Sequence, residues 1–106
     1  MNKPKVYKVL ALYPDGELIS PQIEATSYQG EREIILRYKE GELTCNPHDE
    51  KGIRTWASKE LGIAEANTAQ EKGAALVIHE ATPFGEELTP DFYSAILLGK
   101  EVWRIP

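Results

Sequence analysis

The sequence predicts an α+β fold, a mostly antiparallel sheet of about five or six strands with one principal helix packed on it. Three features indicate this class: the turn sequence Pro14-Asp15-Gly16 between two apolar runs, an alanine-rich segment that begins at Ser58, and consecutive aliphatic residues from Leu76 to Ile78. The 106 residues fit a single α+β domain, 1–106, with one modest core.

The first half of the chain is expected to form two β-hairpins. Residues 6–13 are rich in β-branched, aromatic and aliphatic side chains, and the Pro14-Asp15-Gly16 turn leads into a return strand at 17–19. The runs 31–39 and 42–45 flank a glycine turn, which predicts a second hairpin, although the propensity of 31–39 also suits a helix. Residues 53–56 form a brief extended segment after a polar loop.

The helix is expected over residues 58–72. The Ser58 hydroxyl can accept from the free amides of the first turn, and Gly73 is a suitable residue just past the end of a helix. Spacing predicts that one stripe of this helix faces the sheet: Leu61, Ala64 and Thr68.

The last third contains the predicted central strand, at residues 74–79, which is apolar on both faces. Residues 81–90 are expected to be a loop because they contain Pro83, Gly85 and Pro90. Two alternatives fit the end of the chain: a helix over 89–99, or a strand at 94–98 that turns at 99–100 into a final strand.

Composition excludes several classes of function. With 12 basic and 17 acidic residues the formal net charge is −5, which argues against a nucleic-acid-binding protein. A lone cysteine, Cys45, allows no internal disulfide and favours a reducing compartment. No signal peptide and no apolar run of bilayer length are visible, so we expect a cytoplasmic protein without a membrane partner.

No complete catalytic or metal-binding constellation is visible. Cys45 and His48 have side chains that suit zinc, but a structural zinc site normally has four ligands and there is no second cysteine. The same two residues form a poor candidate for a nucleophilic pair, because no oxyanion-binding glycine pattern lies nearby. The sequence therefore predicts no metal and no cofactor, and it leaves open whether the protein is an enzyme.

Six residues are candidates for lining a cleft or binding site. Lys8 and Arg54 lie in strand-like segments and suit an anionic partner. Trp56 is two residues after Arg54, and the other three lie at or beyond the end of the central strand. His79 also suits a hydrogen-bonded position at the margin of the core. The candidates are Lys8, Arg54, Trp56, His79, Glu80 and Glu87.

The order of elements resembles small uncharacterised bacterial and phage domains, on the residues Tyr7-Lys8, Gly52-Ile53 and Trp56, the helix 58–72 and the strand 75–78. The helix and strand are also similar to part of the ADP-ribosyltransferase fold, in which such a unit frames the NAD cleft. That resemblance implies a cleft in which Lys8 and Trp56 meet Glu80 or Glu87.

Two functions are expected on these grounds. The first is a non-catalytic protein-binding domain of phage or mobile-element origin, which would contact another protein through an exposed apolar patch that includes aromatics such as Tyr93 and Trp103. The second is a small or degenerate NAD-binding relative of the ADP-ribosyltransferases. The sequence identifies no particular partner and leaves open whether the protein forms homo-oligomers.

Overall fold

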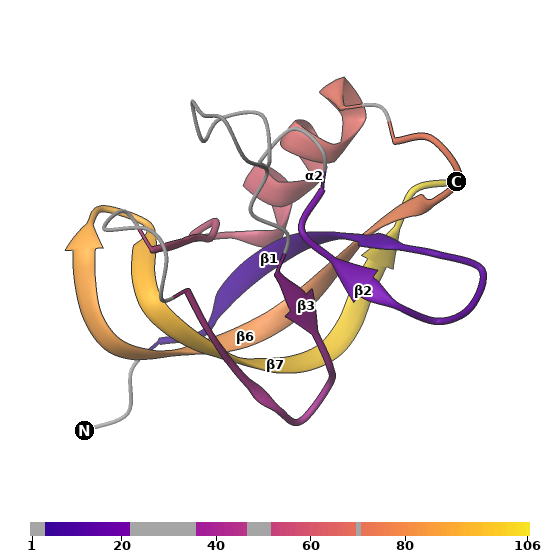
Figure 1. The fold of residues 1–106 in the computed structure, drawn as a ribbon. Coiled ribbons are helices and arrows are strands. Elements are labelled where there is room, and N and C mark those ends of the chain that lie inside the picture. Colours follow the sequence, from indigo (N-terminus) through magenta and orange to yellow (C-terminus); the bar gives the residue numbers. More distant parts are fainter. Residues whose placement is uncertain (1–3, 22–35, 47–51, 70) are drawn as a thin grey trace, which may run out of the picture.

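The computed structural model describes residues 4–21, 36–46, 52–69 and 71–106. The elements in these ranges are β1 (Val6–Leu12), β2 (Leu18–Ile19), β3 (Arg37–Tyr38), β4 (Leu43–Cys45), β5 (Ile53–Arg54), α2 (Lys59–Thr68), β6 (Ala75–Thr89) and β7 (Phe92–Arg104). The described strands form one seven-stranded sheet in the order β3-β2-β1-β6-β7-β4, with β5 also paired to β7 (Figure 1). Every strand pair is antiparallel, so the α+β class is confirmed, with one strand more than the upper expectation.

The first predicted hairpin is confirmed and the second is wrong. β1 and β2 pair across the Pro14-Asp15-Gly16 turn, where the Tyr13 amide donates to the Glu17 carbonyl at 2.9 Å. β3 and β4 are neighbours in sequence, but β3 pairs with β2 and β4 pairs with β7. The start of the predicted strand 31–39 lies outside the described residues, as does most of the polar loop before residue 52.

The two C-terminal strands form a long, strongly curved hairpin (Figure 1). The start of β6 lies between β1 and β7 and is buried on both faces, which confirms the predicted central strand. The loop expected at 81–90 is wrong, because β6 continues through Pro83 and Gly85 to Thr89. Of the two alternatives for the end of the chain, the structure has the strand, with bulges in the ladder in place of the turn at 99–100.

Helix α2 begins as predicted, because the Ser58 hydroxyl accepts a hydrogen bond from the Leu61 amide at 3.2 Å. It ends at Thr68, four residues before the expected end, and residues 71–74 turn the chain into β6. The predicted sheet-facing stripe is wrong, since Leu61 is 54% exposed and the buried residues are Gly62 and Ala66. A side chain at Gly62 would come within 3.1 Å of Ile78, so glycine allows the close approach of helix and sheet.

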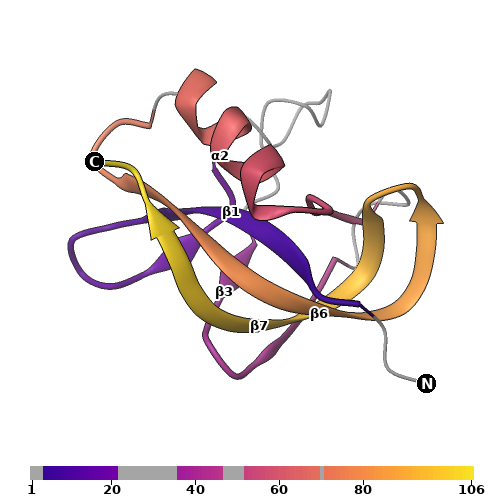
Figure 2. The same ribbon diagram turned by 180° about the vertical axis from the view of Figure 1, so that it is seen from behind.

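Alternation along the strands divides the core in two. One cluster, which includes Leu10, Val77 and Ile96, is enclosed by the curled sheet. The other, which includes Val9 and Ile78, lies between the sheet and α2 (Figure 2). The sheet is curled so that its two end strands, β3 and β4, lie close together. A short turn joins them, and the Thr44 hydroxyl donates to the Arg37 carbonyl at 3.2 Å.

Candidate functional site

Lys8 is a charged residue in the interior of the sheet. The alternation of β1 places Lys8 on the same side as Val6 and Leu10, and it is 0% exposed. Its Nζ donates a hydrogen bond to the backbone carbonyl of Arg54 at 2.8 Å. A buried ammonium requires such partners, because burial of a charge without them is very costly.

Aromatic rings surround this ammonium group. Lys8 Nζ lies 5.8 Å from the ring centroid of Tyr38 and 5.7 Å from that of Trp56. The Trp56 backbone is held against β1, because its amide and carbonyl exchange hydrogen bonds with Tyr7 at 2.8 and 2.9 Å. Cation–π attraction is stronger away from water, so the two rings stabilise the buried charge.

Arg54 is a second cation beside the Trp56 ring. Its Cζ is 5.2 Å from the centroid of Trp56 and 6.0 Å from that of Phe92, and the side chain is exposed. The structure thus brings together three residues that the sequence indicated separately: Lys8, Arg54 and Trp56. It adds Tyr38 and Phe92, which no local sequence signal places near Lys8, Arg54 and Trp56.

His79 is opposite Lys8 in the β1–β6 ladder and is 3% exposed. Its Nδ1 lies 2.8 Å from the carbonyl oxygen of Gly99, and because a carbonyl can only accept, Nδ1 donates. The contact joins β6 to the bulged part of β7, where the register shifts between His79 and Ala81. His79 therefore has a structural hydrogen bond in the core.

The two acidic candidates lie elsewhere. Glu80 is opposite Tyr7, so it points to the other face from Lys8, and its carboxylate binds Lys5 at 2.7 Å. Glu87 accepts from the Asp91 amide at 3.2 Å and from the Tyr93 hydroxyl at 3.3 Å. In the described part of the chain, neither carboxylate forms a hydrogen bond or ion pair with Lys8.

The Lys5–Glu80 pair predicts a specific pH dependence. The hydrogen bond from Lys5 lowers the pKa of Glu80, and the same contact raises the pKa of Lys5. A lowered carboxyl pKa stabilises the fold above the unfolded-state pKa, and this contribution is lost as the pH falls through the folded-state pKa. A raised lysine pKa gives a contribution that is present below the unfolded-state pKa and lost as the pH rises through the folded-state value.

Substitution of Lys5 by methionine is therefore expected to raise the titration midpoint of Glu80, measured by NMR of its side-chain carboxyl carbon. Lys39→Met is the matched control, because Lys39 pairs with a different carboxylate, Glu42. An unchanged Glu80 midpoint in Lys5→Met would contradict the prediction.

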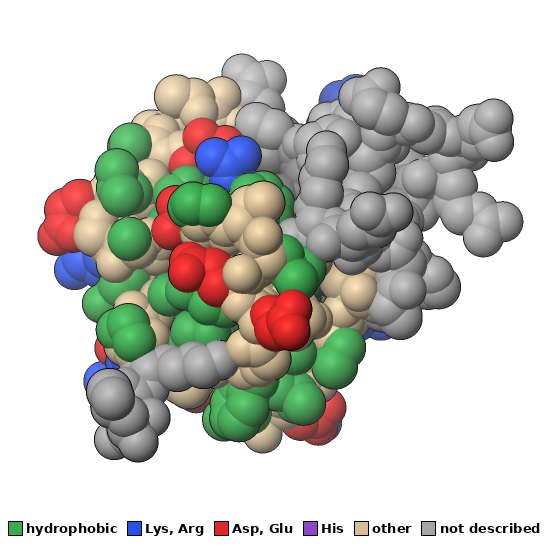
Figure 3. Space-filling model, turned by 90° about the vertical axis from the view of Figure 1, so that its left-hand side faces the viewer, with side chains coloured by type: hydrophobic (Ala, Val, Ile, Leu, Met, Phe, Trp, Pro, Cys, Tyr) green, Lys and Arg blue, Asp and Glu red, His purple; other side chains and the backbone are tan. Residues whose placement is uncertain are grey.

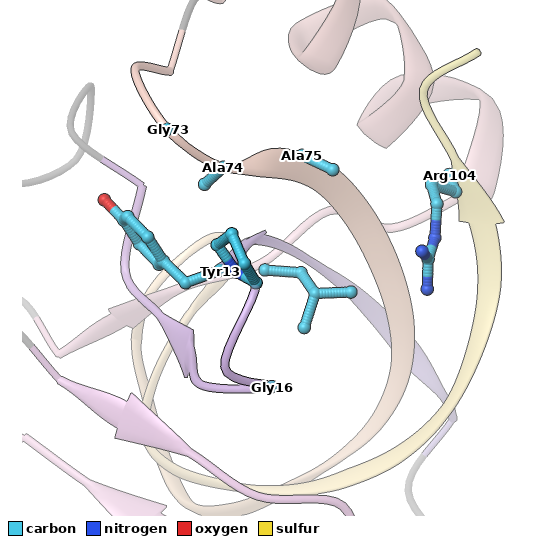
Figure 4. A pocket seen from close by; sticks show the side chains of 8 residues that line it. Tyr13, Gly16, Gly73, Ala74, Ala75 and Arg104 are labelled. Atoms are coloured by element: carbon cyan, nitrogen blue, oxygen red, sulfur yellow. The ribbon is translucent and has the colours of Figure 1, made fainter.

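One surface depression, of about 460 Å³, lies where the β1–β2 turn meets the start of β6 and the end of β7 (Figure 4). Figure 4 labels six of its lining residues: Tyr13, Gly16, Gly73, Ala74, Ala75 and Arg104. The Arg104 guanidinium is bound by Glu101 at 2.8 Å. No residue selected from the sequence lines this depression, and its wall offers mainly small side chains and backbone.

A second surface feature is the side of the β4–β7–β6 sheet that faces away from the cluster enclosed by the curled sheet. Residues that are directly opposite each other in antiparallel strands have their side chains on the same side of the sheet. Ile96 is 0% exposed in the core, so its neighbours in β7, Ala95 and Leu97, point to the other side. We call the other side the outer face, and its residues are Leu43, Leu97, Thr82, Cys45, Ala95 and Phe84. Leu43 is 53% and Phe84 45% exposed, whereas Ala95 is 7% exposed, so apolar surface meets solvent at Leu43 and at Phe84.

Acidic residues lie next to the outer face, at the end of the β6–β7 hairpin. Figure 3 views the side of the molecule on which this hairpin ends; hydrophobic and acidic side chains are mixed over it, with a few basic ones among them. Leu88 adds 37% exposed apolar surface to the hairpin end. The aromatics expected at the surface, Tyr93 and Trp103, are instead half-buried against the two core clusters.

Cys45 is an exposed free thiol, and the described residues contain no group of three or more side chains that could hold a metal ion. His48 lies outside the described residues. No family model, curated protein or solved structure matches the chain. Within the described ranges, no helix is long and apolar enough to cross a membrane.

Proposed function

We propose that this protein is a binding domain that contacts another protein through the outer face. The observation that carries the proposal is the apolar character of this face across three strands. A sheet face that meets solvent normally carries polar side chains, opposite the apolar face that packs on the core. Here Leu43 and Phe84 are both exposed; Leu97 is opposite Leu43, and Ala95 is opposite Phe84.

Exposed apolar patches of this kind mark interaction sites in proteins, because their burial against a partner removes apolar area from water. A third exposed leucine, Leu61, stands on α2, which packs against Val9 and Ile78. Single exposed apolar residues are ordinary on protein surfaces. Leu61 therefore provides a matched control site within the same chain.

A photo-crosslinking amino acid at position 84 is expected to capture one partner in the cells that express the protein, whereas the same group at position 61 captures none. With that partner purified, Phe84→Thr is expected to weaken binding about tenfold or more, the scale of a hot-spot residue. Leu61→Gln is expected to leave the affinity unchanged. Circular dichroism establishes that both variants fold.

Capture from both positions with equal yield, or equal affinity of wild type and Phe84→Thr for the captured protein, would count against the proposal. Threonine is chosen at position 84 because it suits a strand, so loss of binding would not be caused by loss of β6.

A further inference from the structure

The part of the β6–β7 hairpin that carries most of the outer face has acidic residues and no basic ones. Residues 73–99 contain no lysine or arginine, but they contain Glu80, Glu86, Glu87 and Asp91. Lys5 neutralises Glu80, whereas the exposed Glu86, two residues from Phe84, forms no ion pair in the described part of the chain. The segment around Phe84 is therefore acidic, within a chain whose net charge is −5, and Arg54 is a cation held against Phe92 near the hairpin end.

A second copy of this chain does not suit such a surface. Two outer faces brought together would place Glu86 and Glu87 of one copy near the same residues of the other, and like charges at an interface are unfavourable. A partner with lysine or arginine around its apolar residues would instead meet complementary charge.

The free backbone edge of β6 does not suit strand addition either. Pairing with β1 stops at Ala81, so the edge beyond it has no partner strand among the described residues. Pro83 lacks an amide hydrogen, Gly85 has a φ of 75°, and the register shifts between Phe84 and Glu87. These features are the ones that protect edge strands from pairing with other chains.

From these observations we infer that the outer face binds a segment of another protein in which apolar side chains are flanked by lysine or arginine. The inference rests on the proposed function and specifies the chemistry of the partner. The apolar side chains of the segment cover Phe84, Leu97 and Leu43, and its cations lie beside Glu86 and Glu87. Contact is made by side chains on the face, and the β6 edge is not extended by a further strand.

Three synthetic amphipathic peptides of equal length and identical leucine positions test this inference. Their polar positions carry lysine, glutamine or glutamate. Isothermal titration calorimetry at low salt is expected to give the tightest binding for the lysine peptide and none for the glutamate peptide. The lysine peptide is expected to bind more weakly at 1 M salt, where charges are screened beyond about 3 Å.

Glu86→Lys is expected to weaken binding of the lysine peptide about tenfold, because one attractive contact becomes repulsive. Glu65→Lys on α2 makes the same change in net charge away from the outer face and is expected to have little effect. Phe84→Thr is expected to weaken all peptides that bind.

Four results of these experiments would overturn the inference. Equal weakening by Glu65→Lys and Glu86→Lys would show attraction to net charge alone. Binding of the lysine and glutamine peptides with equal affinity, still sensitive to Phe84→Thr, would remove the basic partner but retain the protein-binding function. Absence of peptide binding, or a dimer in sedimentation that Phe84→Thr dissociates, would also reject it.

Discussion

Replacement of Gly52 by alanine is expected to lower the free energy of unfolding by about 3 kcal/mol. Gly52 has a φ of 81°, in the left-handed region that costs L-residues about 1–2 kcal/mol. A Cβ at this position would also lie 2.5 Å from the Tyr93 carbonyl oxygen and 3.0 Å from Leu88 Cδ1. Since the first neighbour is backbone of β7, the strands themselves must shift to relieve the contact. Urea denaturation measures the loss.

Gly16→Ala is the matched control. Gly16 has a φ of 93°, but no atom lies within 4 Å of the place where its Cβ would stand. This variant is expected to lose only the backbone term, about 1 kcal/mol. Equal losses in the two variants would mean that the approach of β5 to β7 does not depend on glycine.

The other large effect is expected at Leu10, where substitution by alanine should cost about 3–4 kcal/mol. Leu10 is 0% exposed and lies in the cluster that the curled sheet encloses, so truncation leaves a cavity that the surrounding strands cannot easily fill. Chemical denaturation of the purified variant measures this difference.

Leu61→Ala makes the same chemical change on a residue that is 54% exposed, and it should alter stability by less than about 0.5 kcal/mol. A loss at Leu61 as large as that at Leu10 would contradict the assignment of the core. The comparison also tests the helix face directly, because the sequence pattern alone placed Leu61 against the sheet.

The elements that could be predicted from sequence are those whose signals are local. The turn at Pro14-Asp15-Gly16, the cap at Ser58 and the apolar strand around Val77 are each specified by a few adjacent residues, and the structure contains all three.

The extension of β6 could not be predicted, because Pro83 and Gly85 are loop signals in a sequence. Pro83 is tolerated because the ladder with β1 has already ended at Ala81, so no strand requires an amide hydrogen on that side. For α2, the side-chain spacing favoured the leucine stripe, whereas the fold places Gly62 against Ile78, where close packing needs the absence of a side chain.

The candidate residues illustrate the same difference between local sequence signals and contacts made by the fold. Each of three residues was a candidate because of its residue type alone: Lys8, Arg54 and Trp56. They lie close together because the Tyr7–Trp56 bridge joins two segments that are distant in the chain. The outer face could not be predicted, because the sequence pattern places Phe84 in a loop and residues 42–45 in a hairpin with 31–39. Its apolar character becomes visible only when the cross-strand register is known.

The pairing of β1 with β6 has a consequence for how the chain folds. Val6 is opposite Ala81, so β1 pairs with β6 only by closing a loop that spans most of the chain. Loops of this length slow folding because the entropy of closure is lost before the contacts are gained. The β6–β7 hairpin is formed from adjacent residues and needs no such closure. We therefore expect it to assemble early, with β1 adding last, so that Lys8 leaves water only in the final step.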